Sequence, residues 1–140
     1  MLLRFDAADG GGRGQAASMR TCVRMTSQGS PYSRFQRALA TGNAALVRAA
    51  AAELPRIGVA EAAAMLLVIE RSEPDRYERA ARRWLAMLCE DRRSSIDLLG
   101  VAQAAAALDA LPSRRPAARA ALAAVCERAG LKDAARAFTS

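Results

Sequence analysis

Apolar residues recur at helical spacing along most of the chain, and the clearest case lies between residues 74 and 90. Tyr77, Ala81, Trp84 and Leu88 follow one another at intervals of four, three and four residues. This spacing places all four on one face of an α-helix. We expect the face to be buried, with Trp84 in the core and its indole N–H bonded to a partner.

Turn and cap residues divide the chain from residue 30 onward into further helices. Serine and asparagine favour helix starts, whereas glycine and proline favour helix ends. The expected start signals are Ser30 with Pro31, Asn43, Ser72 with Pro74, Ser94 or Ser95, and Ser113. The expected stop signals are Gly42, Pro55, Leu111-Pro112 and Gly130. They predict helices at about 31–40, 44–54, 59–71, 74–90, 96–110, 114–129 and 132–138.

Each predicted helix has an expected inward side. The segment 62–69 is apolar all round, which is typical of a helix buried on several sides. The inward sets elsewhere are Leu46, Val47, Ala50 and Leu54; Leu98, Ala102, Ala105 and Leu108; Ala118, Leu122, Val125 and Ala129; and Ala135 with Phe138.

Composition agrees with an all-α fold. Alanine, the strongest helix former, is the commonest residue, and aromatic residues make up only 4% of the chain. Links of a few residues make consecutive helices antiparallel. We therefore predict five to seven short antiparallel helices, arranged as a compact bundle or as a short solenoid-like stack of helical hairpins. No repeat of fixed period favours the stack.

The first segment, residues 1–29, lacks this periodicity and contains the run Asp9 to Gly14, four of whose residues are glycine. A flexible tail is the expected interpretation, because glycine loses much backbone entropy on ordering. An alternative hypothesis is that the natural chain starts at Met19 or Met25. We assign residues 30–140 to a single helical domain.

The residue inventory excludes several chemistries. The chain has no histidine, so histidine-based acid–base catalysis and Ser-His or Cys-His nucleophiles are impossible. The cysteines, Cys22, Cys89 and Cys126, are far apart; the last two lie in apolar helical stretches and are expected to be buried. We expect no catalytic residue, no metal and no cofactor. Glu61 and Glu70 flank the apolar helix and are the acids to inspect for burial.

The location of the protein follows from the same inventory. No apolar run has the length of a membrane span, and the first residues do not form a signal peptide. Unpaired thiols are typical of reducing compartments. The expectation is a cytoplasmic protein without membrane contact.

Positive charge is the strongest compositional bias: the net charge is +7, and Lys132 is the only lysine. Arginines gather in two predicted helices, and a nucleic-acid surface would use them on phosphates. The candidate contacts are Arg76, Arg79, Arg82, Arg83, Arg114, Arg115 and Arg119. The alternative is an ordinary solvated face, because Asp75–Arg79 and Glu78–Arg82 are oppositely charged pairs four residues apart.

Three stretches resemble a known family. They are Tyr32–Leu39 running into Gly42-Asn43, Ala51–Pro55, and Glu73–Trp84. They resemble small Ala- and Arg-rich helical proteins from high-GC actinobacteria, a family without an assigned activity. The resemblance implies a bacterial cytoplasmic setting and transfers no functional residue.

Two hypotheses of function remain open. The first is a non-enzymatic helical module that binds an unknown protein partner or a second copy of itself. The second is a basic accessory protein that binds nucleic acid. Salt separates them, because phosphate contacts weaken steeply as salt rises and apolar docking does not.

Overall fold

The computed structural model describes residues 29–140, and within this range the chain is helical with short links and no strand. Its helices are α1 (Pro31–Thr41), α2 (Ala44–Ala51), α3 (Val59–Ser72), α4 (Pro74–Glu90), α5 (Leu98–Ala110), α6 (Arg115–Arg128) and α7 (Lys132–Thr139). The all-α prediction is confirmed. No helix in residues 29–140 is both long and apolar enough to cross a membrane.

The described residues fall into two units, of which the first ends at Arg37 and the second consists of residues 38–140. In the first unit, Ser30 caps α1 as expected, its hydroxyl accepting the Ser33 N–H at 3.1 Å. The expectations for residues 1–28 concern a part of the chain outside the described residues, so both hypotheses about this segment stay predictions. The rest of the fold described below belongs to the second unit.

Helix starts and ends in this unit follow local chemistry. Gly42, after α1, has a φ of +70°, in the region that favours glycine. Asn43 then caps α2 by accepting the backbone N–H groups of Ala45 and Leu46. Gly130, with a φ of +84°, closes α6 as predicted. Helix α2 ends at Ala51, three residues earlier than expected, because a turn precedes Pro55.

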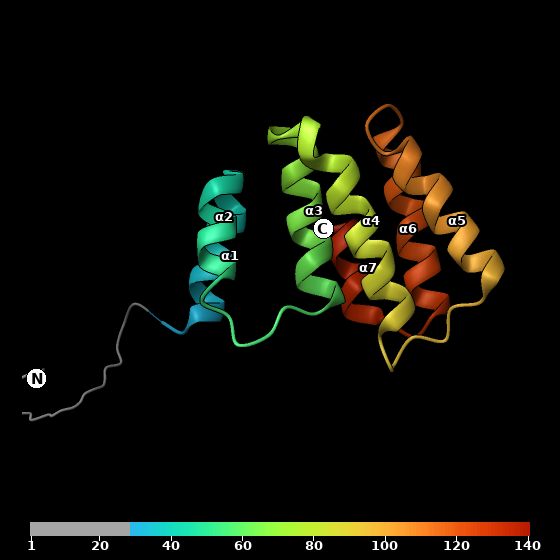
Figure 1. Ribbon diagram of the computed structural model, residues 1–140, viewed down its shortest axis with the longest axis horizontal. Helices are drawn as coiled ribbons and strands as arrows, with labels where there is room; N and C mark the ends of the chain where they lie inside the picture. The colour runs from blue at the N-terminus through green and yellow to red at the C-terminus, as the bar shows by residue number, and fades with distance from the viewer. Residues whose placement is uncertain (1–28) are drawn as a thin grey trace, which may run out of the picture. The chain divides into compact units, whose positions relative to one another are not determined.

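Helices α3 to α7 form a closed bundle. Each packs against the next in sequence, and α7 also packs against α3, while α2 contacts α3 from outside this ring (Figure 1). In a solenoid each element contacts only its neighbours along the chain. The contact between α7 and α3 therefore decides between the two predicted arrangements in favour of a bundle. It also explains why no residue from 59 to 70 is exposed: α3 has neighbours in α2, α4 and α7.

The core of the bundle surrounds Trp84, which is 1% exposed. Its indole N–H donates to the Val59 carbonyl at the start of α3, at 3.1 Å. Its ring meets Phe138 of α7 edge to face, with ring centroids 5.3 Å apart. Tyr77, Ala81 and Leu88 are buried with it, so the predicted stripe of α4 is confirmed.

The inward sets of the last two helices are also confirmed. Ala118, Leu122, Val125 and Ala129 are buried, as are Ala135 and Phe138. In α2, by contrast, Val47 is buried but Leu46 is 51% exposed, so the predicted face of that helix is only partly right.

Three predicted caps are wrong. Ser72 ends α3, its hydroxyl bonding back to the Val68 carbonyl at 2.6 Å, and α4 begins after Glu73 without a side-chain cap. Asp97, not Ser94 or Ser95, caps α5 by accepting the Gly100 N–H at 2.7 Å. Arg114 occupies the N-cap position of α6, which had been predicted for Ser113.

Tyr77 supplies a test of the core. Its hydroxyl donates to the Leu108 carbonyl in the last turn of α5, at 2.6 Å. We expect Tyr77→Phe to lower the free energy of unfolding by about 1–2 kcal/mol, because the buried carbonyl loses its shorter hydrogen bond and keeps only that from the Leu111 N–H, at 3.4 Å. Urea unfolding of the full chain followed by circular dichroism measures the loss. Tyr32→Phe, at a tyrosine that is 51% exposed, is the matched control and should have almost no effect.

The same pair of variants has a second readout in pH. Burial first, and then the charges of Glu70 and Asp109, raise the pKa of Tyr77 from 10.0 to about 12. Since the unfolded chain loses this proton at lower pH than the folded chain, stability should fall as pH rises from 10 through 12. Tyr77→Phe should lessen this fall. An unchanged pH dependence in Tyr77→Phe would contradict the assignment.

Candidate interaction surface

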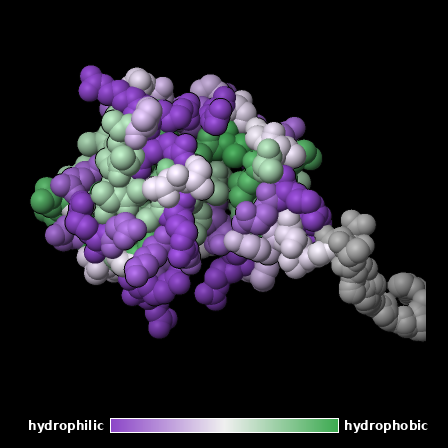
Figure 2. Space-filling model, turned by 180° about the vertical axis from the view of Figure 1, so that it is seen from behind, coloured by the Kyte–Doolittle hydropathy of each residue, from purple (hydrophilic) through white to green (hydrophobic). Residues whose placement is uncertain are grey.

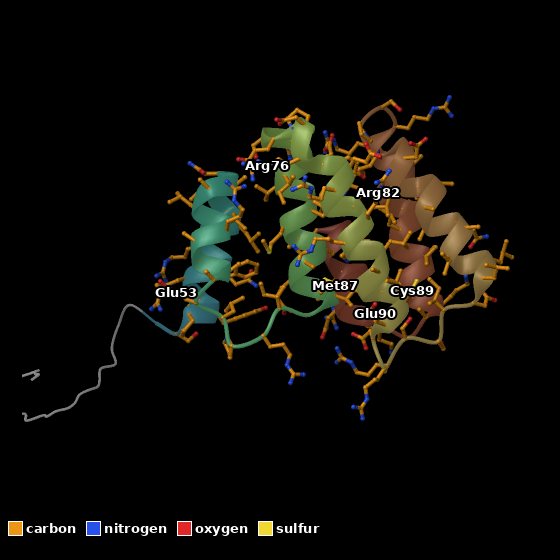
Figure 3. The ribbon with its side chains drawn as sticks, in the orientation of Figure 1. Glu53, Arg76, Arg82, Met87, Cys89 and Glu90 are labelled. Carbon is orange, nitrogen blue, oxygen red and sulfur yellow. The ribbon has the colours of Figure 1, made fainter. Side chains whose placement is uncertain are left out.

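The arginines of α4 lie at the surface, and half of them are paired. Arg82 contacts Glu78 at 2.6 Å, which confirms one of the two predicted pairs. Asp75 and Arg79, the other predicted pair, do not form an ion pair. Arg76 lies 3.8 Å from Glu73, and Arg76 and Arg82 are visible along α4 (Figure 3).

Glu73, between α3 and α4, is shared by two arginines. Arg48 of α2 donates to its carboxylate, and this hydrogen bond holds the pKa of Glu73 below its usual value. The charges of Arg48 and Arg76 act in the same direction. This cluster therefore neutralises part of the positive charge at the start of α4. Arg79 and Arg83 are left exposed, with no ion pair to any described residue.

The arginines at the start of α6 are mostly committed to the fold. Arg115 pairs with Glu70, which is buried at 7% exposure. Arg119 donates to the Phe138 carbonyl at 2.7 Å and to the Ser140 carbonyl, beyond the last turn of α7. Arg114 alone of these three is exposed without a partner among the described residues. Two of the three candidate phosphate contacts at the start of α6 are therefore already bonded to other groups of the fold.

The two acids singled out from the sequence have defined roles. Glu70 joins the end of α3 to the start of α6 through Arg115. Glu61 accepts the Gly58 backbone N–H at 2.9 Å and so caps the start of α3. Both are structural contacts, and neither carboxylate is aimed at a second acid. No group of three or more Cys, Asp or Glu suited to a metal ion occurs in residues 29–140.

The cysteine prediction is half right. Cys126 is fully buried in α6, and burial raises the pKa of its thiol to about 11. Cys89 is exposed near the end of α4, contrary to expectation (Figure 3). It follows Leu88, which occupies the buried stripe, so its own side chain points away from the core. Cys22 lies outside the described residues.

Helix α5 turns two of its three leucines outward, so the sequence prediction for this helix is mostly wrong. Leu98 is 86% exposed and Leu99 66% exposed, whereas Gly100, Ala104 and Ala107 are buried with Leu108. Gly100 lies under the preceding link: a Cβ there would lie 2.8 Å from a side-chain carbon of Ile96. Of the predicted inward set, only Leu108 is buried.

The outward side of α5 forms a continuous, largely apolar strip, which we call the α5 face. It consists of exposed residues that span nearly half the circumference of the helix, namely Leu98, Leu99, Ala102, Gln103, Ala105, Ala106 and Asp109. Asp109 is its only charged member, and α5 contains no arginine or lysine. Strongly hydrophobic side chains project at the edge of the molecule where α5 lies, on the left in Figure 2.

The α5 face is bordered by α6 on one side. Gln103 accepts a hydrogen bond from Arg128, so the two helices meet along this edge. Beside it, α6 exposes a further stripe of alanines: Ala117, Ala120, Ala121 and Ala124. The apolar strip is therefore wider than one helix. Its existence could not be read from the sequence, because every position of α5 except Gln103 and Asp109 is apolar or glycine.

Comparison of the chain with protein-family models, curated proteins and solved structures gives no match.

The commitment of Arg115 to the fold can be tested by mutation. Arg115→Ala should lower the free energy of unfolding by roughly 2–4 kcal/mol, because Glu70 would stay buried without its partner. This loss of stability is smaller than for a fully buried ion pair, because the side chain of Arg115 is 34% exposed. Arg114→Ala, its exposed neighbour, is the control and should change stability by less than about 0.5 kcal/mol. Equal stabilities in urea unfolding would show that the pair contributes nothing.

Proposed function

We propose that this chain is a non-enzymatic helical interaction module that docks a protein partner through the α5 face. The observation that carries the proposal is the exposure of Leu98 and Leu99, at 86% and 66%, side by side in the first turn of α5. They are the two most exposed large apolar side chains in residues 29–140. Adjacent exposed leucines on a largely apolar surface mark a site of protein contact.

The energetics favour an apolar partner. Burying one leucine side chain contributes roughly 1.5–3 kcal/mol, so the pair can anchor an interface as a small central cluster. The alanines around them, Ala102, Ala105 and Ala106, project only a methyl group and let another backbone approach closely. A helix with an apolar stripe is the element that fits such a strip, since its side chains at i, i+3, i+4 and i+7 form a matching row.

An interaction role also fits the chemistry of the chain. Its sequence contains no histidine, and the buried acid Glu70 is held by Arg115. The buried thiol of Cys126, with a pKa of about 11, is kept protonated at neutral pH and is a poor nucleophile. These features support a fold that presents a surface rather than a reacting group.

The proposal predicts a site-specific cross-link. With Ala102 replaced by the photoreactive p-benzoylphenylalanine, irradiation of cells that naturally express the chain should give one dominant protein adduct. The adduct is separated by electrophoresis and identified by mass spectrometry. Leu98→Glu in the same chain should abolish it, because a carboxylate placed on the strip cannot be buried without a partner.

Two exposed positions on α2 are the matched controls. The photoreactive residue at Ala49, also an exposed helical alanine, should give no dominant adduct. Leu46→Glu, at a leucine that is 51% exposed, should leave the Ala102 adduct unchanged. Equal adducts at Ala102 and Ala49, or none at either, would refute docking through the α5 face.

Nucleic-acid binding is the alternative, and it rests on the exposed arginines Arg79, Arg83 and Arg114. Of the seven candidate arginines, these three are the ones left free for phosphates, so they should contribute little to binding of a mixed-sequence DNA duplex or RNA. We expect them to account for a slope of at most about −3 in the logarithm of affinity against the logarithm of salt, given about 0.9 per phosphate contact.

The variants for this measurement are Arg79→Glu and Arg83→Glu, with Arg115→Ala excluded because Arg115 holds Glu70. A slope much steeper than this, together with loss of binding in both variants, would make nucleic acid the main partner.

A further inference from the structure

We propose that the partner of the α5 face is a second copy of this chain, bound with the two α5 helices antiparallel. This inference rests on the proposed function, because it names the occupant of the same surface. It follows from three properties of the strip: its order of large and small residues, its charges and its size.

The order of side-chain sizes makes the α5 face of one copy complementary to the α5 face of a second copy that runs in the opposite direction. The large residues, Leu98 and Leu99, stand at one end, and the small ones, Ala105 and Ala106, stand one to two turns further along. A two-fold axis through Ala102 would place Leu98 of one copy opposite Ala106 of the other, and Leu99 opposite Ala105. Each leucine pair then covers alanines, and the contact is isologous, with both copies using the same residues.

Charge favours the same arrangement. The chain carries a net charge of +7, so two copies repel each other over any face rich in arginine. Helix α5 contains no arginine or lysine, and its single charge is Asp109. A contact through α5 therefore adds no arginine or lysine of that helix to the repulsion between the two copies.

The size of the strip sets the strength of the dimer. A helix of 13 residues is about 20 Å long, and a strip roughly 10 Å wide on each copy buries a total on the order of 500 Å². Stable interfaces bury about 1,200–2,000 Å². The dimer is therefore weak, with a dissociation constant on the order of 10⁻⁵ to 10⁻³ M, and it forms and separates readily.

The first test is the molar mass of the full chain by sedimentation equilibrium, from about ten to several hundred micromolar. A monomer–dimer equilibrium is expected, and Leu98→Glu should weaken it tenfold or more. Leu46→Glu adds the same charge at an exposed leucine of α2 and should leave the equilibrium unchanged. A chain that stays monomeric over the whole range, or a dimer that Leu98→Glu does not weaken, overturns the proposal.

The second test addresses charge. At low salt, Asp109→Arg should weaken the dimer several-fold, because it replaces the only charge of the α5 face by a positive one in both copies of a chain with a net charge of +7. A dimer that Asp109→Arg leaves unchanged overturns the proposal, provided that circular dichroism shows the helix content unchanged.

The outcomes separate this proposal from the proposed function. The chain can prove monomeric while its Ala102 adduct contains a different protein. This outcome overturns the proposal that the partner is a second copy, and it leaves docking through the α5 face intact. A monomeric chain with no adduct overturns both. An adduct composed of two copies of the chain, lost in Leu98→Glu, supports both.

Discussion

The fold depends on how few large side chains an alanine-rich helical chain has for filling its interior. Trp84 meets this constraint by joining α4, on which it lies, to two other helices, since it donates to the Val59 carbonyl of α3 and packs edge to face on Phe138 of α7. Other core positions, such as Ala63, Ala81 and Ala104, are small and still buried. At those positions a side chain of one methyl group lets the helix backbones approach closely.

The sequence predicted best those helices whose two sides differ in chemistry. In α4 the apolar stripe of Tyr77 and Trp84 alternates with charged residues, so only one orientation buries no charge. In α5 almost every residue is apolar, and the hydrophobic pattern is compatible with any rotation about the helix axis. The structure buries the side of Gly100 and Ala104 and leaves Leu98 and Leu99 exposed, a choice that the hydrophobic pattern alone does not make.

The candidate cations show a second limit of sequence reasoning. Local pairs such as Glu78–Arg82 follow from spacing along one helix and were predicted. Arg115 and Arg119 are engaged by Glu70 and by the carbonyls of Phe138 and Ser140, groups that are remote in sequence or at a helix end. Only the closed arrangement of helices brings these partners together. The candidate arginines thus include both exposed charges and residues that bond to other parts of the fold.

Closure of the ring by α7 also has a consequence for synthesis on the ribosome. Among the described helices α7 is made last, yet it covers α3, and three other helices are made between the two. While α4, α5 and α6 emerge, the side of α3 that α7 will cover has no helix packed against it, and Trp84 lacks its contact with the ring of Phe138. The contact that completes the bundle is therefore its most distant in sequence and must form after the local hairpins. During that interval the side of α3 that still awaits α7 stays exposed, and the nascent chain is then most prone to aggregation.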